Sequence, residues 1–105
     1  MRSRRLLETR REIVEALRRV KKEFCAEVYL FGSYAKGTHT IDSDVDIIVV
    51  SEEFRGLNLV DRIVMVRRLL PEDKGFDMIA LTLEEFEEKK KAFYREVSRY
   101  WVRID

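Results

Sequence analysis

The sequence predicts a fold of the α/β or α+β class, in which helices pack on one face of a small mixed sheet. Three observations support this prediction. Apolar residues recur with helical spacing at both ends of the chain, three short apolar segments have the length of strands, and glycine or proline separates these segments. The expected order is helix, strand, strand, helix, strand, helix, without internal repeats. At 105 residues, the chain is expected to form one domain over residues 1–105.

The first predicted helix lies at the start of the chain. Apolar residues at intervals of three, four or seven define its buried face, while arginine and lysine occupy the other face. These apolar residues are Leu6, Ile13, Leu17, Val20 and Phe24. A strand rich in Val, Tyr and Phe is expected at residues 27–31. Gly32 and Ser33 end this strand, and a glycine at this point lets the backbone approach a ligand closely.

Residues 44–50 and 75–81 form the second and third predicted strands. The second is apolar after its first residues, and the third carries one carboxylate, Asp77, between apolar neighbours. Between these strands, Asn58 can cap a helix that ends before Pro71. The pattern leaves open whether the first two strands run antiparallel or belong to a mixed arrangement.

The last predicted helix begins at a capping box. Glu85 follows Thr82 by three residues, the spacing at which each side chain can satisfy a backbone N–H of the other residue. Apolar residues continue along one face of this helix, namely Phe86, Phe93, Val97 and Tyr100 or Trp101. The helix is therefore expected to pack on the sheet.

Two aspartates open the second predicted strand, although carboxylates rarely begin a buried strand for structural reasons. Asp44 and Asp46 are two residues apart, so on an extended segment both side chains leave the same face. Carboxylate oxygens suit Mg²⁺ or Mn²⁺, and Mg²⁺ usually completes its shell with water and substrate phosphates. A site for metal and phosphate is the first hypothesis. Solvation or capping of a strand end is the structural alternative.

This part of the sequence resembles the signature of the minimal nucleotidyltransferases, a compact branch of the DNA polymerase beta superfamily. The resemblance covers nearly the whole chain, and it implies the polymerase beta-like nucleotidyltransferase fold. In that family a third carboxylate lies on a later strand, and Asp77 takes this place here. The residues that carry the resemblance are Gly32, Ser33, Gly37, Ser43, Asp44 and Asp46, followed by the apolar residues 47–50.

The resemblance also implies a two-metal mechanism of nucleotidyl transfer. Asp44 and Asp46 would bind both Mg²⁺ ions, with Mn²⁺ as an alternative metal and ATP as the nucleotide donor. Asp77 would bind the ion that activates the attacking hydroxyl, and would also serve as the base.

Phosphate contacts are expected just after the first predicted strand. Gly32 and Ser33 would hold the triphosphate through backbone N–H groups and the serine hydroxyl. Lys36 stands where many relatives have an arginine, so its contact with a phosphate would be a single point charge.

Composition excludes several classes of protein. The 21 basic and 20 acidic residues give a net charge of +1, so no long nucleic acid is expected as a ligand. An apolar content of 46% argues against disorder. The chain has no apolar run of membrane-spanning length, and its one cysteine, Cys25, is typical of a reducing compartment. A cytoplasmic protein without a membrane segment is expected, with Cys25 in the core.

Several polar and aromatic residues are assigned structural roles. His39 lies in a polar loop and is expected to be exposed to solvent and not to bind metal. Asp42 and Ser43 are expected to form turn hydrogen bonds. Four aromatic residues are expected to pack in the fold or at an interface, because they do not alternate with basic residues as base-stacking platforms do: Tyr34, Tyr94, Tyr100 and Trp101.

The resemblance implies a nucleotidyltransferase that transfers an NMP to a hydroxyl acceptor. The expected NMP is AMP, and its donor is ATP. The acceptor site is expected to be completed by another subunit. One candidate is a helical HEPN-like protein, as in toxin–antitoxin pairs whose antitoxin adenylylates a tyrosine of the toxin, and another is a second copy of the chain. Two alternatives remain open: a non-catalytic, nucleotide-sensing antitoxin or regulatory module, and a transferase that acts on a small molecule such as an aminoglycoside.

Overall fold

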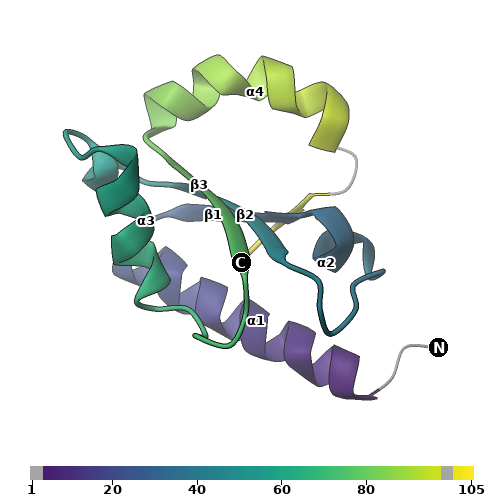
Figure 1. Cartoon of the computed structure of the whole chain (residues 1–105). Coiled ribbons are helices and arrows are strands. Elements are labelled where there is room, and N and C mark those ends of the chain that lie inside the picture. Colours follow the sequence, from purple (N-terminus) through teal and green to yellow (C-terminus); the bar gives the residue numbers. More distant parts are fainter. Residues whose placement is uncertain (1–3, 98–100) are drawn as a thin grey trace.

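A computed structural model describes residues 4–97 and 101–105, with side chains described outside residues 91–97. It confirms the predicted class, a mixed arrangement of helices and strands (Figure 1). In chain order the elements are α1 (Arg4–Glu23), β1 (Glu27–Phe31), α2 (Gly32–Lys36), β2 (Val45–Val50), the 3-10 turn η1 (Glu52–Phe54), α3 (Leu59–Arg67), β3 (Phe76–Leu81), α4 (Leu83–Val97) and β4 (Val102–Arg103).

The four strands form one mixed sheet in the order β3-β2-β1-β4. β1 and β2 run antiparallel, which settles the direction that the sequence pattern left open. β2 and β3 run parallel, because the chain crosses between them through α3. The register of this parallel pair aligns Asp46 with Asp77.

β4 is a strand that the sequence analysis did not predict. Val102 and Arg103 pair antiparallel with β1, and the N–H of Ile104 donates to the carbonyl oxygen of Val28 at 2.9 Å. Ile104 is buried and adds to the core. A strand of two exposed residues has no alternating pattern to detect, which explains the omission. The predicted contacts of Phe93, Val97 and Tyr100 lie outside the described side chains.

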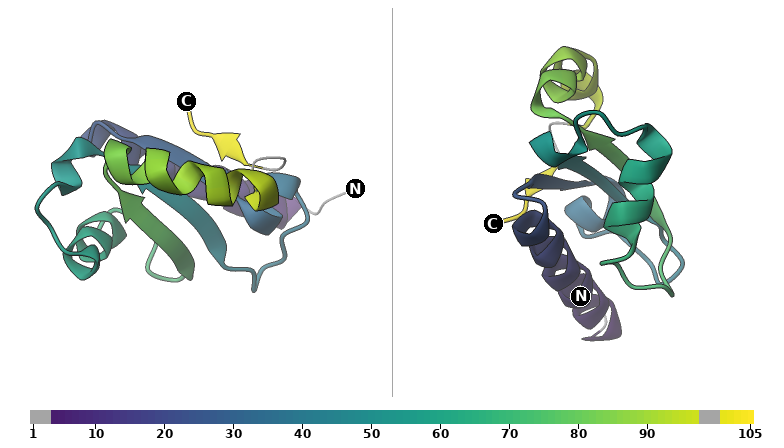
Figure 2. Two further views of the ribbon diagram at one scale, coloured as in Figure 1. Left: turned by 90° about the horizontal axis from the view of Figure 1, so that it is seen from above. Right: turned by 90° about the vertical axis from the view of Figure 1, so that its left-hand side faces the viewer.

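Helices cover both faces of the sheet, which corrects the prediction that they pack on one face. α1 and α3 lie on one side, and α4 lies on the other (Figures 1 and 2). Both faces need cover because β2 is apolar on both. Ile47 and Val49 belong to the core shared with α1 and α3, whereas Ile48 and Val50 pack with Phe86 of α4.

α1 buries most of the predicted stripe: Ile13, Leu17 and Val20 are at most 1% exposed, whereas Leu6 is half-buried. Cys25, in the turn between α1 and β1, was predicted to lie in the core, and this prediction is wrong. Cys25 is exposed, not packed in the core, because the chain reverses there with a φ of 48° and turns its side chain outward. Within the described part of the chain, no helix combines the length and apolar character needed to cross a bilayer.

The predicted caps of α3 and α4 are both confirmed. Asn58 Oδ1 accepts the N–H of Asp61 at 2.8 Å. At α4, the Thr82 N–H donates to Glu85 Oε1 at 2.7 Å, and the Glu85 N–H donates to Thr82 Oγ1 at 3.3 Å. These local hydrogen bonds fix where the two helices begin.

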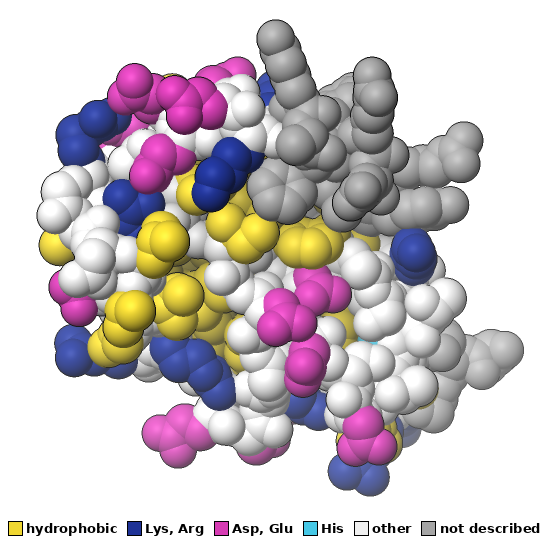
Figure 3. Space-filling model, turned by 45° about the horizontal axis from the view of Figure 1, so that its top comes forward, with side chains coloured by type: hydrophobic (Ala, Val, Ile, Leu, Met, Phe, Trp, Pro, Cys, Tyr) yellow, Lys and Arg dark blue, Asp and Glu magenta, His cyan; other side chains and the backbone are white. Residues whose placement is uncertain are grey.

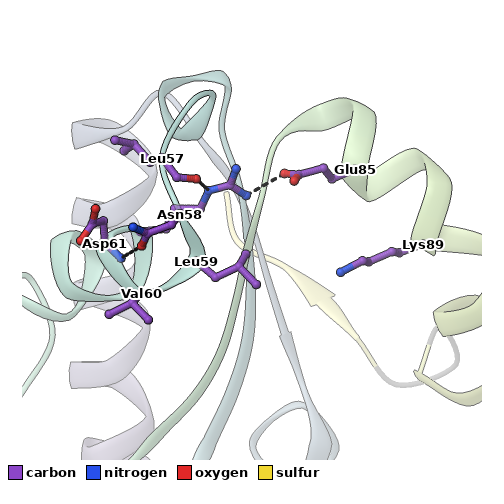
Figure 4. A pocket seen from close by; sticks show the side chains of 8 residues that line it. Leu57, Asn58, Leu59, Val60, Asp61, Glu85 and Lys89 are labelled. Carbon is purple, nitrogen blue, oxygen red and sulfur yellow. Dashed lines mark hydrogen bonds and ion pairs between the residues drawn. The ribbon is translucent and has the colours of Figure 1, made fainter.

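An ion pair ties α3 to α4 through the same capping glutamate. The buried guanidinium of Arg62 donates to Glu85 Oε1 at 2.7 Å and also to the carbonyl oxygens of Ala80 and Leu57. Figure 4 shows Glu85 facing the start of α3. The groove at this place has a volume of about 640 Å³. The groove is lined by Leu57, Asn58, Leu59, Val60, Asp61, Arg62, Glu85 and Lys89.

Glu85 should make the stability of the fold sensitive to acid. The Thr82 N–H and the Arg62 guanidinium lower the pKa of the Glu85 carboxyl from 4.5 to about 2. Because the folded-state pKa lies below the ordinary value, the carboxylate stabilises the fold above pH 4.5, and this contribution is lost as the pH falls towards about 2.

We expect Glu85→Gln to lower the free energy of unfolding near neutral pH by about 1–3 kcal/mol, because it leaves the buried Arg62 charge without its counter-ion. The variant should also lose less stability than the wild type between about pH 5 and about pH 3. Urea denaturation across this range measures both effects. Glu88→Gln, at an exposed position of the same helix, is the control. An acid dependence of Glu85→Gln identical to that of the wild type would contradict this account.

Candidate active site

The three predicted carboxylates meet at one edge of the sheet. Asp46 is the second residue of β2, Asp77 is the second residue of β3, and the two are direct partners in the parallel register. Asp44 lies one residue before β2. β1 runs in the opposite direction, so its last residue, Phe31, pairs with Asp46 and brings the following turn to the same edge.

Asp46 carries the electrostatic cost of this arrangement. Burial raises the pKa of its carboxyl, and the negative charge of Asp77, a hydrogen bond with Asp77 and the charge of Asp44 raise it further. Asp44 and Asp77 are exposed, whereas Asp46 is half-buried. Figure 3 shows acidic side chains gathered on this face beside hydrophobic ones. The cluster holds negative charge that a cation would neutralise.

Two glycines make room for the carboxylates. Gly32 has a φ of 69°, and a Cβ on it would collide with Asp46 Oδ2. A Cβ on Gly75 would collide with Asp44 Oδ1. From the sequence, Gly32 is predicted to contact phosphate, and Gly75 is predicted only to begin a strand. Gly75 directly precedes a strand that carries a carboxylate, and a glycine at such a position indicates that another group packs closely against the backbone.

α2 forms the turn predicted after β1, and it includes Gly32, Ser33 and Lys36. The carbonyl oxygen of Ser33 accepts the N–H groups of Gly37 and Thr38, the latter at 3.0 Å. Gly37 ends the helix in the left-handed conformation with a φ of 77°. Ser33 is half-buried beside the carboxylate edge, and Lys36, the last residue of α2, is exposed.

The segment after α2 is anchored more firmly than its polar sequence predicts. His39 was expected in solvent but is only 1% exposed, and its ring stacks on the buried ring of Tyr34. Nε2 of His39 also lies 3.1 Å from the carbonyl oxygen of Leu6, 33 residues away, a contact that a local sequence pattern cannot reveal. Ser43 forms the predicted turn contacts, since its hydroxyl accepts the Thr40 N–H at 2.8 Å.

The donor chemistry of this edge suits a hard divalent cation. Among the side chains of residues 4–90 and 101–105, no three His, Cys, Asp or Glu form a complete metal-binding group. Mg²⁺ does not require one, because it usually keeps several waters and takes one or two carboxylates with substrate phosphates. The paired Asp46 and Asp77, with Asp44 beside them, fit that requirement.

Gly32→Ala should destabilise the protein more than Gly37→Ala. Both positions have a positive φ, which costs an alanine about 1–2 kcal/mol. A Cβ at Gly37 would meet nothing within 4 Å, whereas one at Gly32 would also displace the Asp46 carboxylate. Chemical denaturation of the two variants separates these contributions. Equal losses of stability would show that the Asp46 carboxylate can move away from residue 32 without cost and is not held in place there.

Comparison with known proteins places these features in a family. Residues 10–102 match the family described as "Nucleotidyltransferase domain". A candidate protein adenylyltransferase of Methanocaldococcus jannaschii is 27% identical over 100 residues, which cover 89% of this chain and 99% of that protein. A second candidate protein adenylyltransferase of the same organism is 40% identical over 42 residues, covering 40% of this chain and 42% of that protein.

Solved structures show the same fold. The crystal structure of a candidate nucleotidyltransferase from Sulfolobus solfataricus aligns with a TM-score of 0.63 and 25% identity, covering 97% of this chain and 87% of that one. A toxin–antitoxin structure with AMP-PNP aligns with a TM-score of 0.65 and 20% identity, covering 88% of this chain and 72% of that one. On the match that spans residues 10–102, this chain belongs to the nucleotidyltransferase domain family.

Proposed function

We propose that this nucleotidyltransferase moves AMP from ATP to a hydroxyl group of a protein, with Mg²⁺ bound at Asp44, Asp46 and Asp77. The observation that carries the proposal is the register that pairs Asp46 with Asp77 at the edge reached by the Gly32 turn. Membership of the family supports nucleotidyl transfer. The names of the two M. jannaschii relatives support a protein as the acceptor.

In this proposal the turn after β1 binds the triphosphate. Gly32 lets the backbone pass close to Asp46, so phosphate oxygens bound there would lie beside the carboxylates. Ser33 would contribute its hydroxyl and backbone N–H, and Lys36 would add a positive charge at the end of α2. The toxin–antitoxin neighbour was crystallised with AMP-PNP, an analogue that supports ATP as the donor.

Asp77 is the residue best placed to receive the proton of the acceptor hydroxyl. It is exposed, and β3 is an edge strand, so an acceptor can approach it from outside the sheet. Bound divalent ions would supply positive charge for a displacement in which the acceptor hydroxyl oxygen attacks the α-phosphorus of ATP and pyrophosphate leaves. Asp44 and Asp46 would then hold the ions, and Asp77 would hold one ion and accept the proton.

The surface of α3 supports a protein as the acceptor. Four of its nine residues are exposed apolar side chains: Leu59, Val60, Ile63 and Val64, which are 38–69% exposed. The end of α3 lies beside the carboxylate-bearing strand, since the Arg67 guanidinium sits 5.2 Å from the ring centre of Phe76. A protein that presents a hydroxyl at Asp77 would cover this surface, which is typical of a contact site. We propose a helical, HEPN-like partner of a toxin–antitoxin pair for this role.

Mg²⁺ or Mn²⁺ with ATP should raise the melting temperature of the wild type. At a ligand concentration of 100 times Kd, linkage contributes about 2.7 kcal/mol, or roughly 10–20 °C for a domain of this size. Asp44→Asn combined with Asp46→Asn should abolish this shift. Without ligand the double variant should be at least as stable as the wild type, because the repulsion among the carboxylates is removed.

Asp73→Asn, which neutralises an exposed carboxylate before β3, is the matched control and should keep the full shift. Differential scanning calorimetry with and without ATP and metal provides both measurements. A shift of equal size in the double variant would rule out metal binding at these carboxylates.

With labelled ATP and Mg²⁺, this protein should modify a tyrosine of the proposed helical, HEPN-like partner and make that partner heavier by one AMP, with release of pyrophosphate. Asp77→Asn should keep much of the ATP affinity while transfer falls by a factor on the order of a hundred or more, as expected on removal of a general base. Intact-mass spectrometry of the partner measures transfer, and calorimetry measures ATP binding.

The outcomes separate the proposal from its rival. Transfer by Asp77→Asn at the wild-type rate would show that another group acts as the base. A partner that binds and is silenced without gaining mass would favour a non-catalytic, nucleotide-sensing module instead.

A further inference from the structure

His39 and Tyr34 form a buried polar pair for which the proposed reaction has no use. Both side chains are at most 1% exposed, and their rings stack with centroids 4.2 Å apart and planes at 14°. Tyr34 follows Ser33 in α2, and His39 lies in the segment that leads to Asp44. The pair therefore connects the turn assigned to the triphosphate with the segment that carries the first carboxylate.

α1 holds both members of this pair. Nε2 of His39 lies 3.1 Å from the carbonyl oxygen of Leu6, and because a carbonyl oxygen can only accept, Nε2 carries the hydrogen. Nε of Arg10 donates to the carbonyl oxygen of Tyr34 at 3.2 Å, which satisfies a backbone group near the end of α2. The first two turns of α1 thus anchor α2 at one point and the following segment at another.

The pair is not optimised for core stability. Tyr34 Oη and His39 Nδ1 are buried and have no hydrogen-bond partner among the described residues. An unpaired buried polar atom is unfavourable, so an apolar ring would serve a purely structural core better at either position. An apolar ring at position 39 could not, however, donate to Leu6. The hydrogen bond to α1 is what the histidine adds.

We infer that His39 is a positioning residue of the nucleotide site, which holds Gly32 and Ser33 at a fixed place relative to Asp44 and Asp46 by joining Tyr34 to α1. The inference rests on the proposed function. His39 acts through Tyr34 and Leu6 and does not itself contact the substrate. Its loss should therefore weaken nucleotide binding more than it weakens the fold.

The test compares two variants at position 39. His39→Phe keeps a ring of similar size for stacking but cannot donate to Leu6. We expect it to remain folded with a melting temperature within a few degrees of the wild type, while its Kd for ATP with Mg²⁺ rises about tenfold, equivalent to about 1.4 kcal/mol. His39→Gln carries an amide N–H that can reach the same carbonyl oxygen, and should recover part of the affinity.

Two controls separate positioning from general destabilisation. Tyr34→Phe keeps the stacked ring and removes the unpartnered hydroxyl, so its stability should be unchanged or higher. Val66→Ala removes buried methyl groups in α3, away from α2, and should lower the melting temperature without changing the Kd. Titration calorimetry with ATP and Mg²⁺, calorimetric melting and amide hydrogen exchange over residues 33–38 are the readouts.

A raised Kd and faster exchange over residues 33–38 in His39→Phe, with neither change in Val66→Ala, would support the inference. Wild-type affinity in His39→Phe would overturn the positioning role and leave the proposed function intact. If the wild type itself bound no ATP in the presence of Mg²⁺, the proposed function would fail, and the role of His39 at a nucleotide site would fail with it.

Discussion

The parallel, in-register pairing of β2 with β3 places Asp46 directly beside Asp77, and the rest of the site follows from that pairing. Parallel neighbours begin at the same edge of a sheet, so a carboxylate near the start of each strand must lie there. β1 runs antiparallel to β2 and ends at this edge, where it delivers the turn that begins at Gly32. Three segments distant in sequence therefore converge without any long loop.

This convergence has an electrostatic cost that the free protein bears. Burial and neighbouring carboxylates raise the pKa of Asp46, so the site favours any process that adds positive charge. The glycines next to these carboxylates, Gly32 and Gly75, leave space that any larger residue would fill. Other interactions stabilise the fold. Both faces of β2 are buried under helices, and the Arg62–Glu85 ion pair joins α3 to α4.

Local signals in the sequence predicted local structure well. Asn58, Thr82 and Glu85 form the expected caps because a cap depends on residues two or three positions apart. Features that depend on distant contacts were not predictable from one sequence. Buried His39 contacts the carbonyl oxygen of Leu6, 33 residues away, and the fourth strand pairs with β1. The exposure of Cys25 accompanies a left-handed backbone conformation that its residue type does not signal. Asp44 and Asp46 were selected from their spacing and Asp77 from the family resemblance, whereas the register that brings the three carboxylates together is not visible in the sequence.

The central claim is that metal and nucleotide bind together at the edge where β2 and β3 begin. Paramagnetic broadening by Mn²⁺ in the presence of ATP tests it most directly, because the effect depends on distance from the ion. The account predicts that the amide resonances of Asp46, Asp77 and Gly32 broaden at the lowest Mn²⁺ concentration, and that the resonance of Arg103, two strands away from Asp46 on β4, broadens later and less. Broadening centred elsewhere, or equal broadening at Arg103, would contradict the account.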